Sequence, residues 1–153
     1  MKEIQYLGYI MNEQVVHVDS AKIQVIHDWP TPKTLKELHS FLGLANFYRR
    51  FVLGFSNIAW ALSKVTKGGA KIKLFWVPAQ QQAFEELKQC LCSTPILTLP
   101  DLQQHFEIET DASDYVVDAV LTQHGHLVAY HSETLSNTVC NYPTYDKEMY
   151  SIV

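Results

Sequence analysis

The chain has 153 residues, 47% of them hydrophobic, and a formal net charge of −4, a composition that excludes intrinsic disorder and supplies a core for one compact domain or two small ones. No apolar run approaches the roughly 18 residues of a membrane span, and the first residues lack the apolar stretch of a signal peptide, so we expect a cytoplasmic or nuclear protein. The three cysteines lack CxxC spacing, which argues against a disulfide framework and a zinc site.

Three short helices are expected in the first 68 residues. Asp19 or Ser20 is placed to cap the first, and Thr34 and Glu37 have capping-box spacing at the start of the second. The glycine pair 68–69 is expected to end the third helix and to mark a domain boundary. Apolar residues recur every three or four positions in each helix: Ile23 and Ile26, then Leu35, Leu38, Leu42 and Ala45, then Ile58, Leu62 and Val65.

Beyond this boundary the pattern predicts a helix, three strands and a last helix. Pro78 suits the first turn of the helix, and Pro95 follows its end. The three strands form an antiparallel meander with a turn at His124 and Gly125; they cover residues 105–110, 115–123 and 126–135. Residues 143–153 predict a helix with an apolar stripe of Tyr145, Met149 and Ile152. The predicted fold class is therefore α+β, a small helical bundle followed by a meander with helices.

Charge is divided unevenly along the chain. Residues 1–100 carry 11 Lys or Arg against 7 Asp or Glu, a balance of +4, whereas residues 101–153 carry 1 against 9, a balance of −8. Two such halves suit a phosphate-contacting surface joined to a cation site. Uneven solvated faces would give the same pattern, so charge alone leaves both interpretations open.

Two carboxylates in the acidic half are candidates for a shared site. Asp111 stands at the end of the first predicted strand, where an isolated Asp is typical of a turn. Glu148 follows Tyr145 by three residues and so borders the apolar stripe of the last helix. If that helix packs over the sheet, the two carboxylates converge, and a close pair of carboxylates favours a hard cation such as Mg²⁺.

Other polar residues nearby have simpler interpretations. Asp114 is expected to cap the turn between strands, and Asp118 is expected to be either a charge at a sheet edge or an unfavourable substitution in an apolar strand. His124 and His126 lack a third nearby ligand, which favours a solvated loop over a metal site.

Five colinear blocks of sequence cover most of the chain: FLGLANFYRRFV with FSNIAWALSKV, FWVPAQQQAFEELKQCLCSTPILTLPD, FEIETDASDYVVDAVLTQ, VAYHSETL and NYPTYDKEMYSIV. In this order they resemble the end of reverse transcriptase and the start of ribonuclease H in gypsy-type LTR retrotransposon polyproteins. The resemblance implies that residues 1–68 are the end of the polymerase palm with the thumb and connection helices. It implies that residues 69–153 are the N-terminal, incomplete part of an RNase H-like domain.

The resemblance also implies a chemistry. Asp111 and Glu148 match catalytic, metal-binding positions of the family, which imply Mg²⁺ or Mn²⁺ and hydrolysis of RNA in RNA–DNA hybrids by a parent that also synthesises DNA on RNA. The polymerase aspartates of the family belong upstream of Met1, and its further RNase H aspartates belong downstream of Val153. We therefore expect this chain to bind metal weakly and to be inactive alone. The alternative is a non-catalytic nucleic-acid-binding or protein-interaction module left by a decayed element.

Partners follow from the same comparison. A thumb-like surface is expected to bind RNA–DNA hybrid or duplex without sequence preference and in a salt-sensitive manner, although a solvated helix end would also favour positive charge. The first predicted strand, residues 105–110, is expected to leave one edge unpaired and open to self-association or a partner strand. The candidate contact residues are Lys33, Lys36, Tyr48, Arg49 and Arg50.

The sequence departs from the family pattern at two positions. Trp60 stands where proline is usual, and Asp118 stands where glycine is usual. Asp118 places a side chain and a charge where the family leaves the backbone bare.

Overall fold

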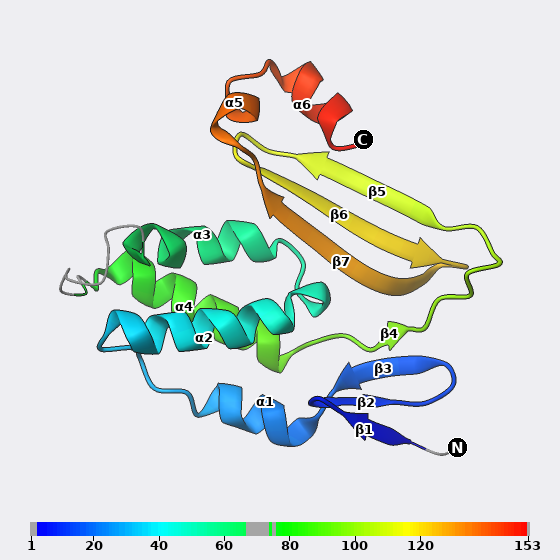
Figure 1. Cartoon of the computed structure of the whole chain (residues 1–153), viewed down its shortest axis with the longest axis horizontal. Coiled ribbons are helices and arrows are strands. Elements are labelled where there is room, and N and C mark those ends of the chain that lie inside the picture. The colour runs from blue at the N-terminus through cyan, green and yellow to red at the C-terminus, as the bar shows by residue number, and fades with distance from the viewer. Residues whose placement is uncertain (1–2, 67–73, 75, 153) are drawn as a thin grey trace.

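The computed structural model describes residues 3–66, 74 and 76–152, which form two antiparallel sheets and a group of helices (Figure 1). The first sheet has the order β1-β2-β3-β4. Its strands are β1 (Ile4–Tyr6), β2 (Tyr9–Met11), β3 (Val15–Val18) and β4 (Leu97–Thr98). The sequence does not predict this sheet because strands of two to four residues are too short to show an alternating pattern.

The predicted helices of the first part are confirmed. They are α1 (Ser20–His27), α2 (Leu35–Phe47), the 3₁₀ turn η1 (Arg49–Phe51) and α3 (Phe55–Thr66). The Asp19 carboxylate accepts a bond from the amide of Ala21 at 3.0 Å, which caps α1. The Thr34 hydroxyl accepts from the amide of Glu37 at 3.2 Å, and the Glu37 carboxylate accepts from the amide of Lys33 at 2.7 Å. The reciprocal bond of α2 thus reaches one residue further back than a capping box requires.

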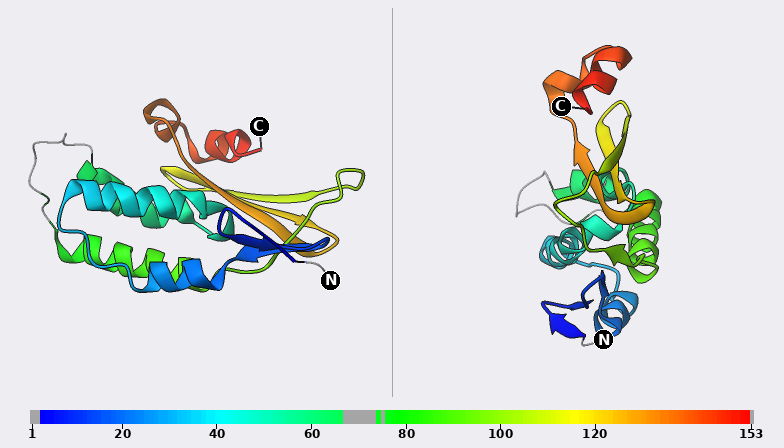
Figure 2. Two further views of the ribbon diagram at one scale, coloured as in Figure 1. Left: turned by 60° about the horizontal axis from the view of Figure 1, so that its bottom comes forward. Right: turned by 90° about the vertical axis from the view of Figure 1, so that its right-hand side faces the viewer.

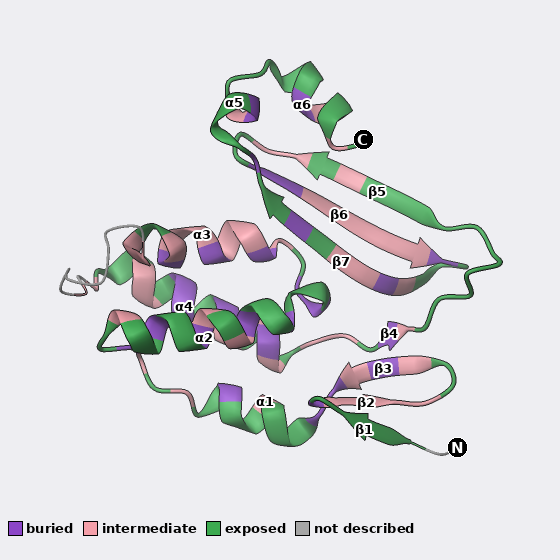
Figure 3. Cartoon of the chain, viewed as in Figure 1, coloured by how far each residue is buried: buried purple, intermediate pink, exposed green. Residues whose placement is uncertain are grey.

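One hydrophobic core joins these helices to α4 (Pro78–Cys92). The rings of Phe41 on α2 and Phe84 on α4 lie 4.6 Å apart between centroids, and both side chains are fully buried. Figure 3 shows buried positions gathered on the sides of α2, α3 and α4 that face one another. The predicted boundary at 68–69 lies outside the described residues, while the core on its two sides is continuous.

The predicted meander is confirmed as β5 (Glu107–Ala112), β6 (Val116–Gln123) and β7 (His126–Thr134), with β6 in the centre. His124 and Gly125 have φ of +52° and +74°, the left-handed conformations of a tight hairpin turn. Two short helices follow, α5 (Asn137–Cys140) and α6 (Thr144–Tyr150). The α+β fold class is confirmed.

The apolar stripe predicted for the last helix is wrong. Tyr145 is 74% exposed, Met149 50% and Ile152 72%, whereas Lys147 is only 6% exposed. A helix of 7 residues that meets the sheet mainly at β5 buries a single narrow side, and that side carries Lys147.

The three-stranded sheet separates the last helices from the first ones. In Figure 2, α6 lies on one side of β5, β6 and β7, and α2, α3 and α4 lie on the other. The sheet therefore has one face toward α6 and one face toward α3. Among the described residues, no helix has the length and apolar character needed to cross a membrane.

Candidate functional site

Asp111 lies on β5 and is exposed. In the strand register it stands opposite Asp118 on β6, which stands opposite Ser132 on β7. Residues directly opposite each other in a sheet point to the same face. Asp118 and Ser132 both form hydrogen bonds with α3, so the row that contains Asp111 belongs to the α3 face of the sheet.

Glu148 lies on α6 and is half-buried. Two contacts hold α6 against β5 and the turn after it. The Ser151 hydroxyl lies 3.1 Å from the Thr110 hydroxyl and donates to the Glu148 carbonyl oxygen at 2.7 Å. The Lys147 ammonium donates to the backbone carbonyl of Asp114 at 3.3 Å. These anchors bring the backbone of Glu148 close to the strand that carries Asp111.

Asp111 does not lie on the face of the sheet that α6 contacts. Thr110 points toward Ser151, the residue directly after α6, and successive side chains of a strand point to opposite faces, so Asp111 points away from α6. A meeting of Asp111 and Glu148 therefore requires Glu148 to reach past the end of β5. That convergence remains a prediction.

The donor set suits a hard cation in chemistry but is small in number. Carboxylate oxygens are the ligands that Mg²⁺ prefers. Asp118 on β6 stands beside Asp111 in the strand register. The buried Oδ1 of Asp118 has no hydrogen-bond partner in the part of the chain that the structure describes. Across residues 3–66, 74 and 76–152, no group of three or more His, Cys, Asp or Glu side chains could hold a metal ion. The carboxylates of the site are thus of the right chemical type for a metal ion but supply only part of its ligands.

One interpretation of the sequence places Asp118 at a sheet edge, and the structure corrects it. Asp118 lies on the central strand, and its Oδ2 accepts from the amide nitrogen of the Asn57 side chain at 2.9 Å. The predicted turn cap is also corrected, because the Ser113 hydroxyl, not Asp114, accepts from the amide of Val116 at 3.1 Å. His124 and His126 are exposed, as expected.

The four predicted basic contact residues are exposed but form two groups. Lys33 and Lys36 lie at the start of α2, and Arg49 and Arg50 lie in η1 just beyond its end. At a rise of 1.5 Å per residue, the two groups lie about 20 Å apart along the helix. A single ligand that touches both must therefore be long.

The predicted contact through Tyr48 needs correction. Tyr48 is 2% exposed and its ring packs edge-on against Tyr9 with 5.5 Å between centroids. Burial raises the pKa of the Tyr48 hydroxyl, with a smaller contribution from the nearby Asp19. Periodicity explains the error, because Tyr48 continues the buried stripe of α2 while its neighbour Phe47 is 45% exposed.

The structure adds a surface that the sequence analysis did not identify. A line of exposed side chains, here called the α2 stripe, runs along the solvent side of the helix into η1; it comprises Lys36, Ser40, Gly43, Phe47 and Arg50. Their spacing of four and three residues places them on one helical face. A Cβ on Gly43 would meet no atom within 4 Å, so neither internal packing nor a left-handed backbone accounts for glycine in mid-helix. The sequence signal that could have identified this surface is the spacing of four and three residues on the side of α2 opposite its apolar positions.

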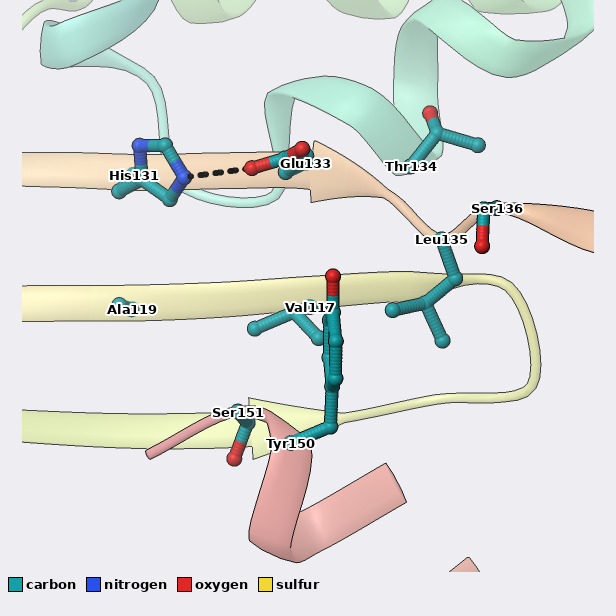
Figure 4. A pocket seen from close by; sticks show the side chains of 9 residues that line it. All are labelled: Val117, Ala119, His131, Glu133, Thr134, Leu135, Ser136, Tyr150 and Ser151. Carbon is teal, nitrogen blue, oxygen red and sulfur yellow. Dashed lines mark ion pairs between the residues drawn. The ribbon is translucent and has the colours of Figure 1, made fainter. Parts of the chain in front are cut away.

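A pocket of about 610 Å³ lies on the α6 face of the sheet. Figure 4 shows Tyr150 of α6 and Ser151 just after it on one side of the pocket, and His131 and Glu133 of β7 on the other. His131 and Glu133 approach to 3.5 Å and are both well exposed. The pocket is thus separated from Asp111 by the sheet.

Comparisons with known proteins match a family model to the second half of the chain and relatives to nearly all of it. Residues 76–153 match the family described as the RNase H-like domain found in reverse transcriptase. The retrovirus-related Pol polyprotein from transposon opus of Drosophila melanogaster is 33% identical over 99% of the chain. The transposon Tf2-3 polyprotein of Schizosaccharomyces pombe is 36% identical over 99% of the chain.

Solved structures of similar fold extend the comparison. The foamy viral protease-reverse transcriptase in complex with dsDNA superposes with a TM-score of 0.87 and 25% identity over 99% of this chain and 32% of its own. The same viral protein in complex with RNA/DNA hybrid gives a TM-score of 0.87 and 26% identity over 98% of this chain and 21% of its own. The chain spans 16% of the opus polyprotein and 12% of the Tf2-3 polyprotein.

Proposed function

The chain belongs to the family of RNase H-like domains found in reverse transcriptase, and on that premise we propose that it handles duplex nucleic acid within a retrotransposon polyprotein. Its helices bind an RNA–DNA hybrid or duplex along the α2 stripe. Its sheet contributes Asp111, and its last helix Glu148, to the metal-dependent hydrolysis of the RNA strand by the longer parent protein. RNA-directed DNA synthesis is the other activity we assign to that parent.

The observation that carries the binding proposal is the α2 stripe. It joins basic groups at both ends of a helix, with an aromatic ring and an open glycine between them. Phosphates can be neutralised at the ends, while Gly43 lets the sugar–phosphate backbone or a groove edge approach the helix closely. The foamy viral structures that superpose on this chain contain dsDNA or RNA/DNA hybrid, which supports the same class of ligand here.

A salt series measured by fluorescence anisotropy tests the proposal. Binding to labelled hybrid or duplex should weaken by at least tenfold between about 50 and about 200 mM salt, because bound cations are released when Lys and Arg neutralise phosphates. Replacing Arg49 and Arg50 with Ala should weaken binding and flatten the salt dependence. Lys22→Ala, on the exposed surface of α1, is the matched control. Equal affinity at both salt concentrations would refute the contact.

For hydrolysis, RNase H-like domains generally use divalent metal ions. In this chain Asp111 and Glu148 would hold Mg²⁺ or Mn²⁺ through their carboxylate oxygens. An ion held there would supply the positive charge that activates water and stabilises the leaving oxygen. With two such ligands, we expect weak binding, on the order of millimolar or poorer.

The free edge of β5 is a second proposed contact. Among the described residues, β5 pairs with β6 alone, so its other edge can accept a partner strand or a second copy of the chain. The strand β5 carries three acidic side chains, Glu107, Glu109 and Asp111. Their negative charge opposes pairing between two copies of the chain and favours a less acidic partner strand. Sedimentation of the chain across a range of concentrations tests self-association.

A non-catalytic nucleic-acid-binding or protein-interaction module is the alternative function. The small ligand set at Asp111 favours it, because binding along α2 needs no metal. The test uses the complete parent protein. The alternative is supported if that protein binds duplex without hydrolysing RNA and if its binding is unchanged in Asp111→Asn and in Glu148→Gln.

A further inference from the structure

We propose that Asn57 and Trp60 of α3 are positioning residues that hold the three-stranded sheet, and Asp111 with it, in one orientation against the helices that carry the α2 stripe. The structural part of this proposal stands alone. Its meaning for hydrolysis rests on the proposed function.

The first contact of α3 with the sheet is a reciprocal pair of serines. The Ser56 amide donates to the Ser132 hydroxyl at 2.8 Å, and the Ser56 hydroxyl donates to the Ser132 carbonyl oxygen at 3.0 Å. Ser132 is 7% exposed, so water competes poorly for these bonds. Together they fix the start of α3 on β7.

The second contact reaches the central strand. Asn57 donates to Oδ2 of Asp118 at 2.9 Å, while Oδ1 of the same carboxylate is buried without a partner. A buried carboxylate oxygen without a donor costs free energy. Asp118 is therefore a poor residue for the strand by itself, and the bond to α3 is the interaction that offsets this cost.

The third contact is aromatic. The rings of Trp60 and Tyr115 stack with 5.4 Å between centroids and an interplanar angle of 21°. The Lys64 ammonium lies 4.7 Å from the centre of the Trp60 ring. Tyr115 belongs to the turn between β5 and β6, close to the end of β5 where Asp111 lies.

The three contacts do not lie on one line. They touch β7, β6 and the β5–β6 turn, all from the first two turns of α3, which runs beside the sheet in Figure 1. Contacts at three separate points prevent the sheet from rocking about the helix, whereas a single contact would act as a hinge. Trp60 and Asp118, the two departures from the family pattern, both take part in this contact.

The functional consequence concerns the path of the duplex. Asp111 stands beside Asp118 in the register, so rotation of the sheet on α3 would move Asp111 relative to the α2 stripe. A fixed orientation sets how far along a bound duplex the carboxylate lies. Asn57 and Trp60 would thus select a position of cleavage without touching the reacting atoms.

Pulsed electron paramagnetic resonance on the full chain tests the orientation. Spin labels are placed at Gln82→Cys on α4 and Glu107→Cys on β5, both exposed, after Cys90, Cys92 and Cys140 are changed to Ala. We expect one narrow distance distribution that broadens at least twofold in the double variant N57A/W60A. Asp118→Asn, which keeps an acceptor for Asn57, should stay narrow, and Asp118→Gly should broaden. Glu133→Ala on β7 is the control.

The single variants Asn57→Ala and Trp60→Leu, which removes the stacked ring, keep the test decisive if the double variant unfolds by circular dichroism. Each should broaden the distribution in a folded chain, and an unchanged width in both would overturn the proposal. Because these measurements need neither nucleic acid nor metal, a failure to bind duplex would refute the proposed function and leave the positioning result intact. An iron chelate attached at Glu107→Cys should cut a bound, end-labelled duplex over a narrow range, and N57A/W60A should widen that range. Equal ranges would show that Asn57 and Trp60 have no positioning role on the duplex.

Discussion

The ammonium group of Lys147 on α6 lies 3.3 Å from both the backbone carbonyl and a carboxylate oxygen of Asp114. Lys147 is 6% exposed, whereas the Asp114 side chain is 93% exposed. The bond to the backbone carbonyl therefore counts for more than the ion pair, because the exposed carboxylate remains hydrated. Lys147 ties the helix of Glu148 to the turn that follows Asp111.

Lys147→Met should loosen α6 without unfolding the protein. Methionine keeps most of the buried aliphatic chain and removes the donor, a loss of about 1 kcal/mol for a hydrogen bond to the turn. Hydrogen exchange of the amides in Thr144–Tyr150 should accelerate severalfold, while exchange in α2 stays unchanged. Asp114→Ala, which leaves the backbone acceptor in place, should have the smaller effect. Identical hydrogen exchange in Lys147→Met and in the unsubstituted chain would show that the contact does not hold α6.

Gly43→Ala should separate stability from binding. Alanine is favoured over glycine in a helix interior by about 0.5–1 kcal/mol, and the added Cβ meets no atom within 4 Å, so the melting temperature should rise. Duplex affinity should fall if the nucleic acid approaches the helix at this point, and Gly43→Leu should reduce it further. Gly54, whose φ is +65°, is the contrasting position, where alanine should destabilise. Unchanged affinity in Gly43→Leu would remove the α2 stripe as the binding surface.

Stability should fall at alkaline pH in a way that depends on Tyr48. Its pKa is raised in the folded protein, chiefly by burial, so the folded state holds the hydroxyl proton more tightly than the unfolded chain does. The resulting stabilisation is complete below the unfolded pKa of about 10 and is lost as pH rises through the higher folded pKa. Tyr9 acts in the same direction. Urea unfolding at several pH values should show that the free energy of unfolding declines less steeply with pH in Tyr48→Phe than in the unsubstituted chain. Parallel declines in the two proteins would contradict this assignment.

Local signals in the sequence specify most elements of the fold. The caps at Asp19 and Thr34 and the left-handed turn at His124 and Gly125 depend on neighbours within four residues, so sequence patterns predict them well. The pairing of β4 with β3 joins Leu97 to Val16. Strands of two to four residues carry no pattern that could predict such a distant partner.

The candidate site divides in the same way. The resemblance locates Asp111 and Glu148, but which face of β5 each approaches depends on the docking of α6 through Lys147 and Ser151. The wrong stripe at Tyr145 and Met149 has the same cause, because a 3.6-residue period shows that a helix has an apolar side but not what covers it. Tyr48 shows the converse, since its burial continues the buried period of Phe41 and Ala45, which the sequence already displays.

The last prediction is that this chain alone does not cleave RNA in a hybrid. Hydrolysis of a phosphodiester by two metals requires enough carboxylates to hold both ions about 4 Å apart and to neutralise them. Asp111 lies on the α3 face of the sheet and α6 packs on the other face, and the two predicted ligands, Asp111 and Glu148, are too few to hold both ions. The purified chain incubated with labelled hybrid and Mg²⁺ or Mn²⁺ should leave the RNA intact. Cleavage that disappears in both Asp111→Asn and Glu148→Gln would contradict this expectation, and its persistence or loss in Asp118→Asn would then show whether the buried, unpaired oxygen of Asp118 supplies a further ligand.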